Sequence, residues 1–197
     1  MSVVKPKKTR SATVKDKAIR AALDLAAERA WNGVSLSDIA RKAKISLADL
    51  REHFDDRADI LTAWGRMLDR RILDKVKEPD NSLSPRERLF DLLMERFDML
   101  NEERDAVLSI LSSFYPDPKQ AVIALPHLAQ SMTWMLEAAG IETTGLRGAV
   151  RVAGLTGLYL KTLWAWKNDD SADMPKTMAE LDKNLERVER WAGMIAL

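Results

Sequence analysis

Residues 34–54 have the sequence VSLSDIARKAKISLADLREHF and contain two helix-start signals. Ser35 is followed three residues later by Asp38, and Ser46 is followed at the same spacing by Asp49. In this pattern a hydroxyl and a carboxylate satisfy the first free backbone N–H groups of a helix. The segment therefore predicts two short helices, each with its own N-terminal cap.

The apolar residues of this segment are spaced so that each helix buries one face. They are Leu36, Ile39, Ala40 and Ala43 in the first helix, Ile45 in the turn, and Leu47, Leu50 and Phe54 in the second helix. Two capped helices around a turn of about three to four residues are typical of a helix-turn-helix, whose second helix can enter the major groove of DNA. An ordinary helical hairpin in an all-α bundle has the same pattern, so the flanking sequence has to decide.

The composition is that of a soluble globular protein: 197 residues, 46% hydrophobic and 31% charged. There is no cysteine, which excludes disulfides and thiolate chemistry. The first ten residues have no apolar core of a secretory signal, and the longest uncharged stretch, residues 120–136, is too short and too polar to span a membrane. We expect a cytoplasmic protein without integral membrane association.

The net charge of +1 hides an uneven distribution. Residues 1–20 carry seven basic side chains and one acid, residues 21–72 are balanced, and residues 73–197 carry fifteen basic and twenty acidic side chains. A basic arm next to a helix-turn-helix suits attraction to phosphate and insertion into the minor groove. Lys7, Lys8 and Arg10 are its candidate DNA contacts, although a solubilising tail has the same composition.

The rest of the chain also has helical periodicity, with no strand-like alternation and no internal repeat. We therefore predict an all-α fold. It comprises a flexible basic arm over residues 1–12, a three-helix helix-turn-helix domain over 13–56 and a helical C-terminal domain over 57–197. The expected helices outside the helix-turn-helix span residues 13–31, 57–77, 84–101, 104–115, 119–139, 144–166 and 175–196.

The last two expected helices carry patterns that favour self-association. Ala149, Ala153 and Gly157 recur every four residues, which allows a partner helix to approach closely. A coiled-coil spacing follows in the last helix, at Leu181, Leu185, Val188 and Ala192. The pair could form half of a four-helix dimer interface. Alternatively, the same pattern arises when these helices pack on the rest of their own subunit.

In this order of helices, two motifs resemble those of the TetR family of one-component bacterial repressors. Residues 36–43 are similar to the family's Val-x-(Asp/Glu)-Ile-Ala-x-x-Ala, and residues 53–61 to its His-Phe-x-x-Lys-x-x-Leu-Leu. The resemblance implies a homodimer whose N-terminal helices bind operator DNA, while the C-terminal domain dimerises and binds a small effector. We therefore expect a transcriptional regulator, acting as a repressor that a small apolar ligand releases.

The resemblance also assigns roles to single residues. It implies that Ser35 reaches phosphate, that Arg57 replaces a lysine contacting the DNA backbone, and that the recognition helix presents Ser46, Leu47, Ala48, Arg51 and His53. Asp49 stands where the family usually has a neutral residue, and Glu52 adds a second carboxylate. Both acids oppose the approach of a polyanion.

Residues 86–94 and 169–182 also resemble lipid-binding proteins of ubiquinone biosynthesis that have the TetR fold. This second resemblance implies an alternative function, an isoprenoid-binding accessory protein. The basic arm and the helix-turn-helix favour the regulator, whereas Asp49 and Glu52 favour the alternative. Residues 180–197, with three basic and four acidic side chains, are a poor complement to an anionic membrane surface.

An enzyme is not expected, nor a cofactor or metal site. His53 and His127 are the only histidines, and no glycine-rich phosphate loop follows a strand. An effector cavity would be apolar and enclosed by the middle helices. Its candidate lining residues, for each of which plain core packing is the favoured interpretation, are Trp64, Phe90, Met94, Phe97, Leu128, Trp134, Met135, Tyr159 and Leu163.

Overall fold

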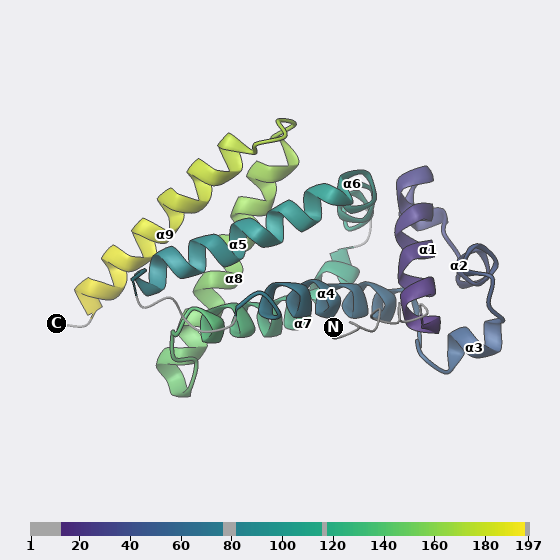
Figure 1. The fold of residues 1–197 in the computed structure, drawn as a ribbon, viewed down its shortest axis with the longest axis horizontal. Coiled ribbons are helices and arrows are strands. Elements are labelled where there is room, and N and C mark those ends of the chain that lie inside the picture. Colours follow the sequence, from purple (N-terminus) through teal and green to yellow (C-terminus); the bar gives the residue numbers. More distant parts are fainter. Residues whose placement is uncertain (1–12, 77–81, 116–117, 196–197) are drawn as a thin grey trace, which may run out of the picture.

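The computed structural model describes residues 13–76, 82–115 and 118–195, which contain nine α-helices, one short 3-10 helix and no strand. The all-α prediction is confirmed. Figure 1 shows an elongated molecule with helices α1, α2 and α3 at one end and the last helix, α9, at the opposite end. The basic arm, with Lys7, Lys8 and Arg10, lies outside the described residues.

The N-terminal helices begin where the cap signals placed them. Helix α1 spans Val14–Glu28, α2 spans Leu36–Ala43 and α3 spans Leu47–Arg51. A reciprocal capping box opens each of them, at Thr13, Ser35 and Ser46 respectively. Helix α1 ends at residue 28 rather than at the expected residue 31. The reason is that the backbone of Arg29 is extended and Trp31–Gly33 form the separate 3-10 helix η1.

Six further helices build the C-terminal part. Helix α4 starts at an Asp56 cap and ends at residue 73 rather than 77, and α5 starts at a Ser84 cap followed by proline. Their bounds are Arg57–Leu73 for α4, Pro85–Glu102 for α5, Arg104–Ser113 for α6, Pro118–Ala138 for α7, Gly145–Lys167 for α8 and Pro175–Ile195 for α9. Proline 126 lies inside α7 and does not end it.

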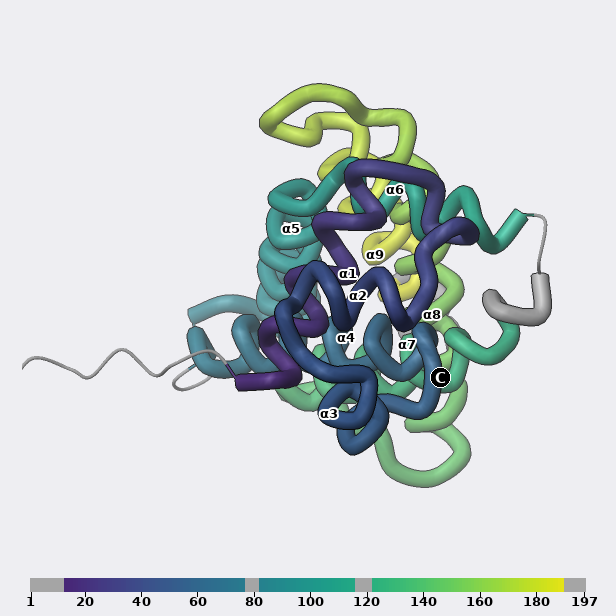
Figure 2. The backbone as a smooth tube through the Cα atoms, turned by 90° about the vertical axis from the view of Figure 1, so that its right-hand side faces the viewer, coloured from purple at the N-terminus to yellow at the C-terminus, as the bar shows by residue number. Residues whose placement is uncertain are grey.

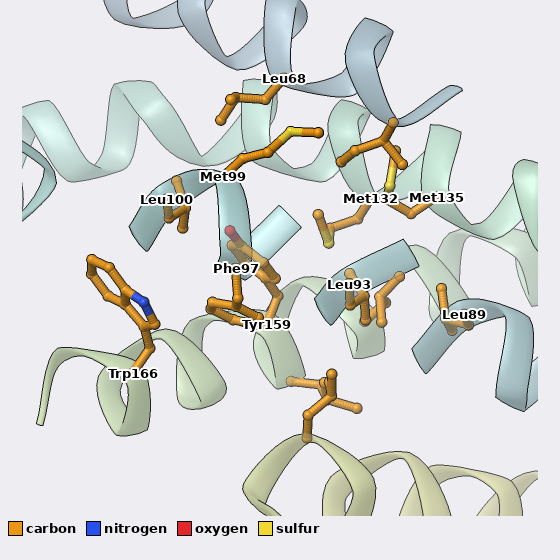
Figure 3. Packing of buried hydrophobic residues seen from close by; sticks show 14 of the residues in the cluster. Leu68, Leu89, Leu93, Phe97, Met99, Leu100, Met132, Met135, Tyr159 and Trp166 are labelled. Atoms are coloured by element: carbon orange, nitrogen blue, oxygen red, sulfur yellow. The ribbon is translucent and has the colours of Figure 1, made fainter. Parts of the chain in front are cut away.

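The buried residues form two clusters. The first joins α1, α2 and α3 to the start of α4 and to α6, through Ile60, Ala106 and Ile110. The second fills the space between α4, α5, α7, α8 and α9, and Figure 3 shows its centre around Phe97 and Tyr159. Trp64 of α4 packs against both clusters. Helix α4 therefore connects the helix-turn-helix core to the C-terminal core.

Helix α6 forms a second support for the N-terminal helices. The Ser109 hydroxyl accepts a hydrogen bond from the Trp31 N–H (3.0 Å) and donates one to the Arg29 carbonyl (3.2 Å). An ion pair joins Arg20 of α1 to Glu103, the residue just before α6. These bonds satisfy backbone groups in the turn after α1, where helical partners are missing.

The Ser35 cap yields a stability prediction. Replacing Ser35 with alanine removes the acceptor for the Asp38 N–H, and we expect the free energy of unfolding to fall by about 1 kcal/mol. Ser37→Ala is the matched control, because Ser37 is exposed inside the same helix and caps nothing. Urea unfolding of the two variants measures the difference. Equal losses in both would contradict the role given to the cap.

Candidate nucleic-acid interface and ligand cavity

Helix α3 presents one face to the protein and the other to the exterior. Leu50 is buried against α1 and α2, while Leu47 is 52% exposed and Ala48, Arg51 and His53 are also exposed. Figure 2, which views the molecule from the helix-turn-helix end, shows α3 at the outer edge with no other helix in front of it. The predicted recognition helix is therefore open to a partner.

Ser46 and Asp49 bind each other at the start of α3. The Ser46 hydroxyl donates to Asp49 Oδ2 (2.7 Å) and accepts from the Asp49 N–H (3.0 Å), while the Ser46 N–H donates to Oδ2 (3.2 Å). The hydrogen bonds from the Ser46 hydroxyl and N–H lower the pKa of Asp49 below its ordinary value. Its carboxylate is thus used in folding α3, and the free N–H groups at the helix start offset part of its charge.

Arg51 and Glu52 are both exposed at the end of α3. The Arg51 guanidinium forms an ion pair with Asp55, in which both side chains are largely exposed to solvent, and donates to the Phe54 carbonyl at 3.4 Å. Exposed ion pairs of this kind contribute about 0–1 kcal/mol. Arg51 can therefore exchange Asp55 for a phosphate or a guanine at small cost.

Arg57, the first residue of α4, binds the protein's own backbone. Its Nη1 donates to the Trp31 carbonyl (2.8 Å) and the Val34 carbonyl (2.6 Å), and its guanidinium lies 5.3 Å from the centroid of the Trp31 ring. These bonds fix α4 to the turn before α2. Ser35, whose hydroxyl caps α2, lies with Arg57 in one surface depression beside that turn.

A cavity of about 310 Å³ lies between α4, α6 and α7, with further walls from α5 and α8. This volume is at the lower end of the range for small-molecule sites, about 300–1,000 Å³. Its exposed side includes His127 and Trp134, and its buried side includes Leu100 and Val107. Five of the predicted lining residues line it: Trp64, Leu128, Trp134, Tyr159 and Leu163.

The other four predicted lining residues do not line this cavity. Phe97 and Met135 are fully buried in the C-terminal core, and Phe90 and Met94 pack against that core. The Phe97 ring stacks on the Tyr159 ring with centroids 5.1 Å apart, as the close-up in Figure 3 shows. Periodicity identifies the inward face of a helix, but it does not separate core residues from cavity residues on that face.

A polar cluster in the cavity wall was not predicted. Asp69 and Arg96 form a buried ion pair, Ser131 donates a hydrogen bond to Asp69, and Arg96 Nε donates to the Tyr159 hydroxyl at 3.1 Å. The signal for it is Arg96, a charged residue at an inward position of α5 between Leu93 and Leu100. A buried charge needs a partner, but the sequence alone does not show which residue that partner is.

The comparisons with known proteins agree with this architecture. Residues 18–64 match the family model of the bacterial regulatory proteins of the tetR family. The structure of a TetR transcriptional regulator from Nitrosomonas europaea superposes with a TM-score of 0.71 at 26% identity, covering 89% of this chain and 97% of that one. Residues 18–64 of this chain therefore resemble the TetR family, and the chain as a whole is similar to a solved TetR regulator. A search of curated proteins found no significant match.

A further solved structure shares the fold of this chain. The TetR transcriptional regulator from Rhodococcus sp. RHA1 has a TM-score of 0.62 at 17% identity, covering 88% of this chain and 94% of that one. Both similarities cover most of the chain rather than the helix-turn-helix alone. No helix in the described part of the chain is long and apolar enough to cross a membrane.

The residues predicted for a dimer interface separate into two groups. Ala149, Ala153 and Gly157 of α8 are exposed, as is Val188 of α9. The prediction that Leu181 and Leu185 lie in a dimer interface is wrong, because both are buried in the C-terminal core of their own subunit. The Ala192 side chain lies outside the described ones. The α9 periodicity thus serves mainly intramolecular packing.

Helix α8 carries exposed apolar residues that the sequence analysis did not single out. They are Leu146, Val150, Leu160 and Trp164, and they follow the same helical face as the small residues. A Cβ atom added at Gly154 or Gly157 would meet nothing within 4 Å in this chain. The fold of the subunit therefore does not require glycine at these two positions.

The cap of α2 makes the stability of the protein depend on pH. Hydrogen bonds from the Ser35 hydroxyl and N–H lower the pKa of Asp38 from 3.8 to about 2. The stabilisation is therefore complete above about pH 4 and is lost as pH falls toward 2. We expect the stability gap between wild type and Asp38→Asn, measured by urea unfolding, to close over this range.

Asp173→Asn serves as the control for this measurement, because Asp173 is exposed in the loop between α8 and α9. Its stability should track the wild type at every pH. A gap between Asp38→Asn and wild type that stays constant from pH 5 to pH 2 would show that the Asp38 charge does not support the cap.

Proposed function

We propose that this chain is a dimeric DNA-binding transcriptional regulator, acting as a repressor, whose affinity for its operator is changed by a small, mainly apolar ligand. The observation that carries the proposal is the exposed outer face of α3, held on a helix-turn-helix core at one end of the molecule. In a helix-turn-helix protein, this face of the second helix enters the major groove.

The side chains on α3 have the chemistry for reading base pairs. Arg51 can donate two hydrogen bonds to guanine, and the apolar Leu47 and Ala48 can contact a thymine methyl group. Ser46 and Asp49 are occupied in the cap, so in this proposal they shape the start of α3 rather than read bases. The basic residues of the arm, Lys7, Lys8 and Arg10, would supply phosphate and minor-groove contacts.

The exposed face of α8 supports the dimer. Its apolar residues form an unusual surface for a monomer, and its small residues permit a partner helix to approach closely. A second copy of α8, with the exposed Val188 of α9 beside it, would cover this face and create a two-fold interface. Residues 57–197 would then form the ligand-binding and dimerisation domain, and residues 13–56 the DNA-binding domain.

The cavity is placed to couple ligand binding to DNA binding. Four residues line the cavity and also pack in the helix-turn-helix core: Leu61 and Trp64 of α4, Ile110 of α6, and Phe114 just after α6. A ligand that fits one arrangement of these helices better than another shifts the population of α3 positions. The two proposed binding events therefore act on the same side chains.

The lipid-binding alternative gains no support. Both solved structures described above are TetR transcriptional regulators, and the one from Nitrosomonas europaea is 26% identical to this chain. Asp49, one of the two carboxylates that favoured the alternative, is used in the cap of α3. Asp49 and Glu52 are both exposed, and Glu52 is the one that takes no part in the capping box of α3.

Binding to DNA tests the proposal. We expect the purified protein to bind DNA from its own promoter region selectively, with an affinity that falls steeply with salt and less steeply after deletion of residues 1–12. Arg51→Ala should weaken selective binding by about 1–3 kcal/mol, because it removes one base contact. Fluorescence anisotropy over a salt series measures both effects.

Arg70→Ala is the matched control, because Arg70 is an exposed arginine near the far end of α4 that pairs with Asp74. It should leave DNA affinity nearly unchanged. Absence of selective binding even at low salt would overturn the proposed function. Unchanged affinity in Arg51→Ala would remove Arg51 from the recognition surface.

A further inference from the structure

We propose that the buried end of the cavity selects a ligand with an uncharged head group that both donates and accepts hydrogen bonds, a hydroxyl above all, on an apolar body. The inference rests on the proposed regulator function and specifies the chemistry of its ligand. The carboxylate and the ammonium compound of the same carbon skeleton should bind more weakly.

The head-group site is formed where four helices meet. Asp69 comes from α4, Arg96 from α5, Ser131 from α7 and Tyr159 from α8, and each is at least nine-tenths buried. All four line the cavity. They form one connected cluster, in which Asp69 binds Arg96 and Ser131, and Arg96 binds Tyr159. The positions of these polar groups are therefore fixed by the packing of the helices.

The cluster leaves hydrogen-bonding capacity on the cavity side. Both bonds to Asp69 use Oδ1, so Oδ2 has no donor among the described residues. Arg96 donates through Nε and Nη1, and its Nη2 has no acceptor among the described residues. The Tyr159 oxygen accepts from Arg96, which leaves the Tyr159 proton to be donated. Burial raises the pKa of the Tyr159 phenol, so that proton stays in place.

The charges of Asp69 and Arg96 cancel, and this neutrality favours an uncharged head group on the ligand. Asp69 and Arg96 form a neutral pair, so a second carboxylate would lie beside Asp69 and an ammonium beside Arg96 with no compensating charge. A hydroxyl can donate to Asp69 and accept from Arg96 or Tyr159 without adding charge. The other basic side chains of the lining, Arg66 and His127, are exposed at its outer side, where water screens them.

Four compounds with one carbon skeleton test the proposal: 3-phenylpropan-1-ol, 3-phenylpropanoate, 3-phenylpropan-1-amine and propylbenzene. We expect the wild-type protein to bind the alcohol at least about tenfold more tightly than each of the other three at pH 7. Calorimetric titration measures the affinities, and a change in tryptophan fluorescence, to which Trp64 and Trp134 of the cavity lining contribute, gives a second signal. Preference for the carboxylate or the amine, or failure of the alcohol to bind, would overturn the proposal.

Asp69→Asn should reverse the order of the alcohol and the carboxylate. Asparagine keeps the acceptor for Arg96 and Ser131 but leaves the buried Arg96 charge without compensation, and a ligand carboxylate can then supply the missing charge. The control is Asp91→Asn, the same change at an exposed position of α5 that does not line the cavity. An unchanged order of affinities in a folded Asp69→Asn variant would contradict the inference.

Tyr159→Phe keeps the test decisive if Asp69→Asn fails to fold. It retains the ring that stacks on Phe97 and removes only the hydroxyl. Alcohol affinity should fall at least about fivefold, while propylbenzene affinity stays the same. DNA binding is measured separately. Lost DNA binding with intact head-group selectivity would refute the regulator alone, and intact DNA binding with the carboxylate preferred would refute the head-group inference alone.

Discussion

The attachment of the helix-turn-helix to α4 and α6 is the constraint on which the rest of the structure depends. Arg57 donates to the Trp31 and Val34 carbonyls from the start of α4, and Ser109 of α6 bonds the turn on its other side. These groups lie between α1 and α2, outside both α-helices, so their bonds fix both helices to the C-terminal part. The direction in which α3 faces follows from this attachment.

The same two helices bring the cavity next to the helix-turn-helix. Leu61 of α4 and Ile110 of α6 each contribute to the N-terminal core and to the cavity lining. Close-packed cores respond to a change in volume by moving between discrete arrangements rather than deforming continuously. In the proposed regulator, a ligand inside the cavity would act on the attachment itself, without a long relay through the protein.

Local features of the sequence were the most predictable part of the structure. The caps at Ser35 and Ser46 involve residues three positions apart, so the sequence alone located the starts of α2 and α3. The roles of Leu181 and Leu185 depended on which helix they meet, and the same spacing serves a dimer seam or an internal core. The predicted cavity residues show the same limit. Trp64 lines the cavity as predicted, whereas Phe97, on an equally inward face, is buried in the core.

The polar cluster and the bonds of Arg57 could not be predicted from the sequence, because both depend on contacts between distant parts of the chain. Asp69 and Arg96 are 27 residues apart and meet only because α4 packs on α5. Arg57 occupies a family position associated with the DNA backbone, yet its bonds to backbone carbonyls can be seen only in the folded chain. Pairings between distant helices require coordinates, whereas caps do not.

The spacing of α3 in a DNA-bound dimer tests the central claim most directly. The chain has no cysteine, so Glu52→Cys, at the exposed end of α3, places a single spin label on each protomer. With promoter-region DNA bound, pulsed electron paramagnetic resonance should give one narrow distance distribution near one helical turn, about 34–36 Å. No distance between protomers, or a distribution that DNA neither narrows nor moves to this spacing, would contradict the account.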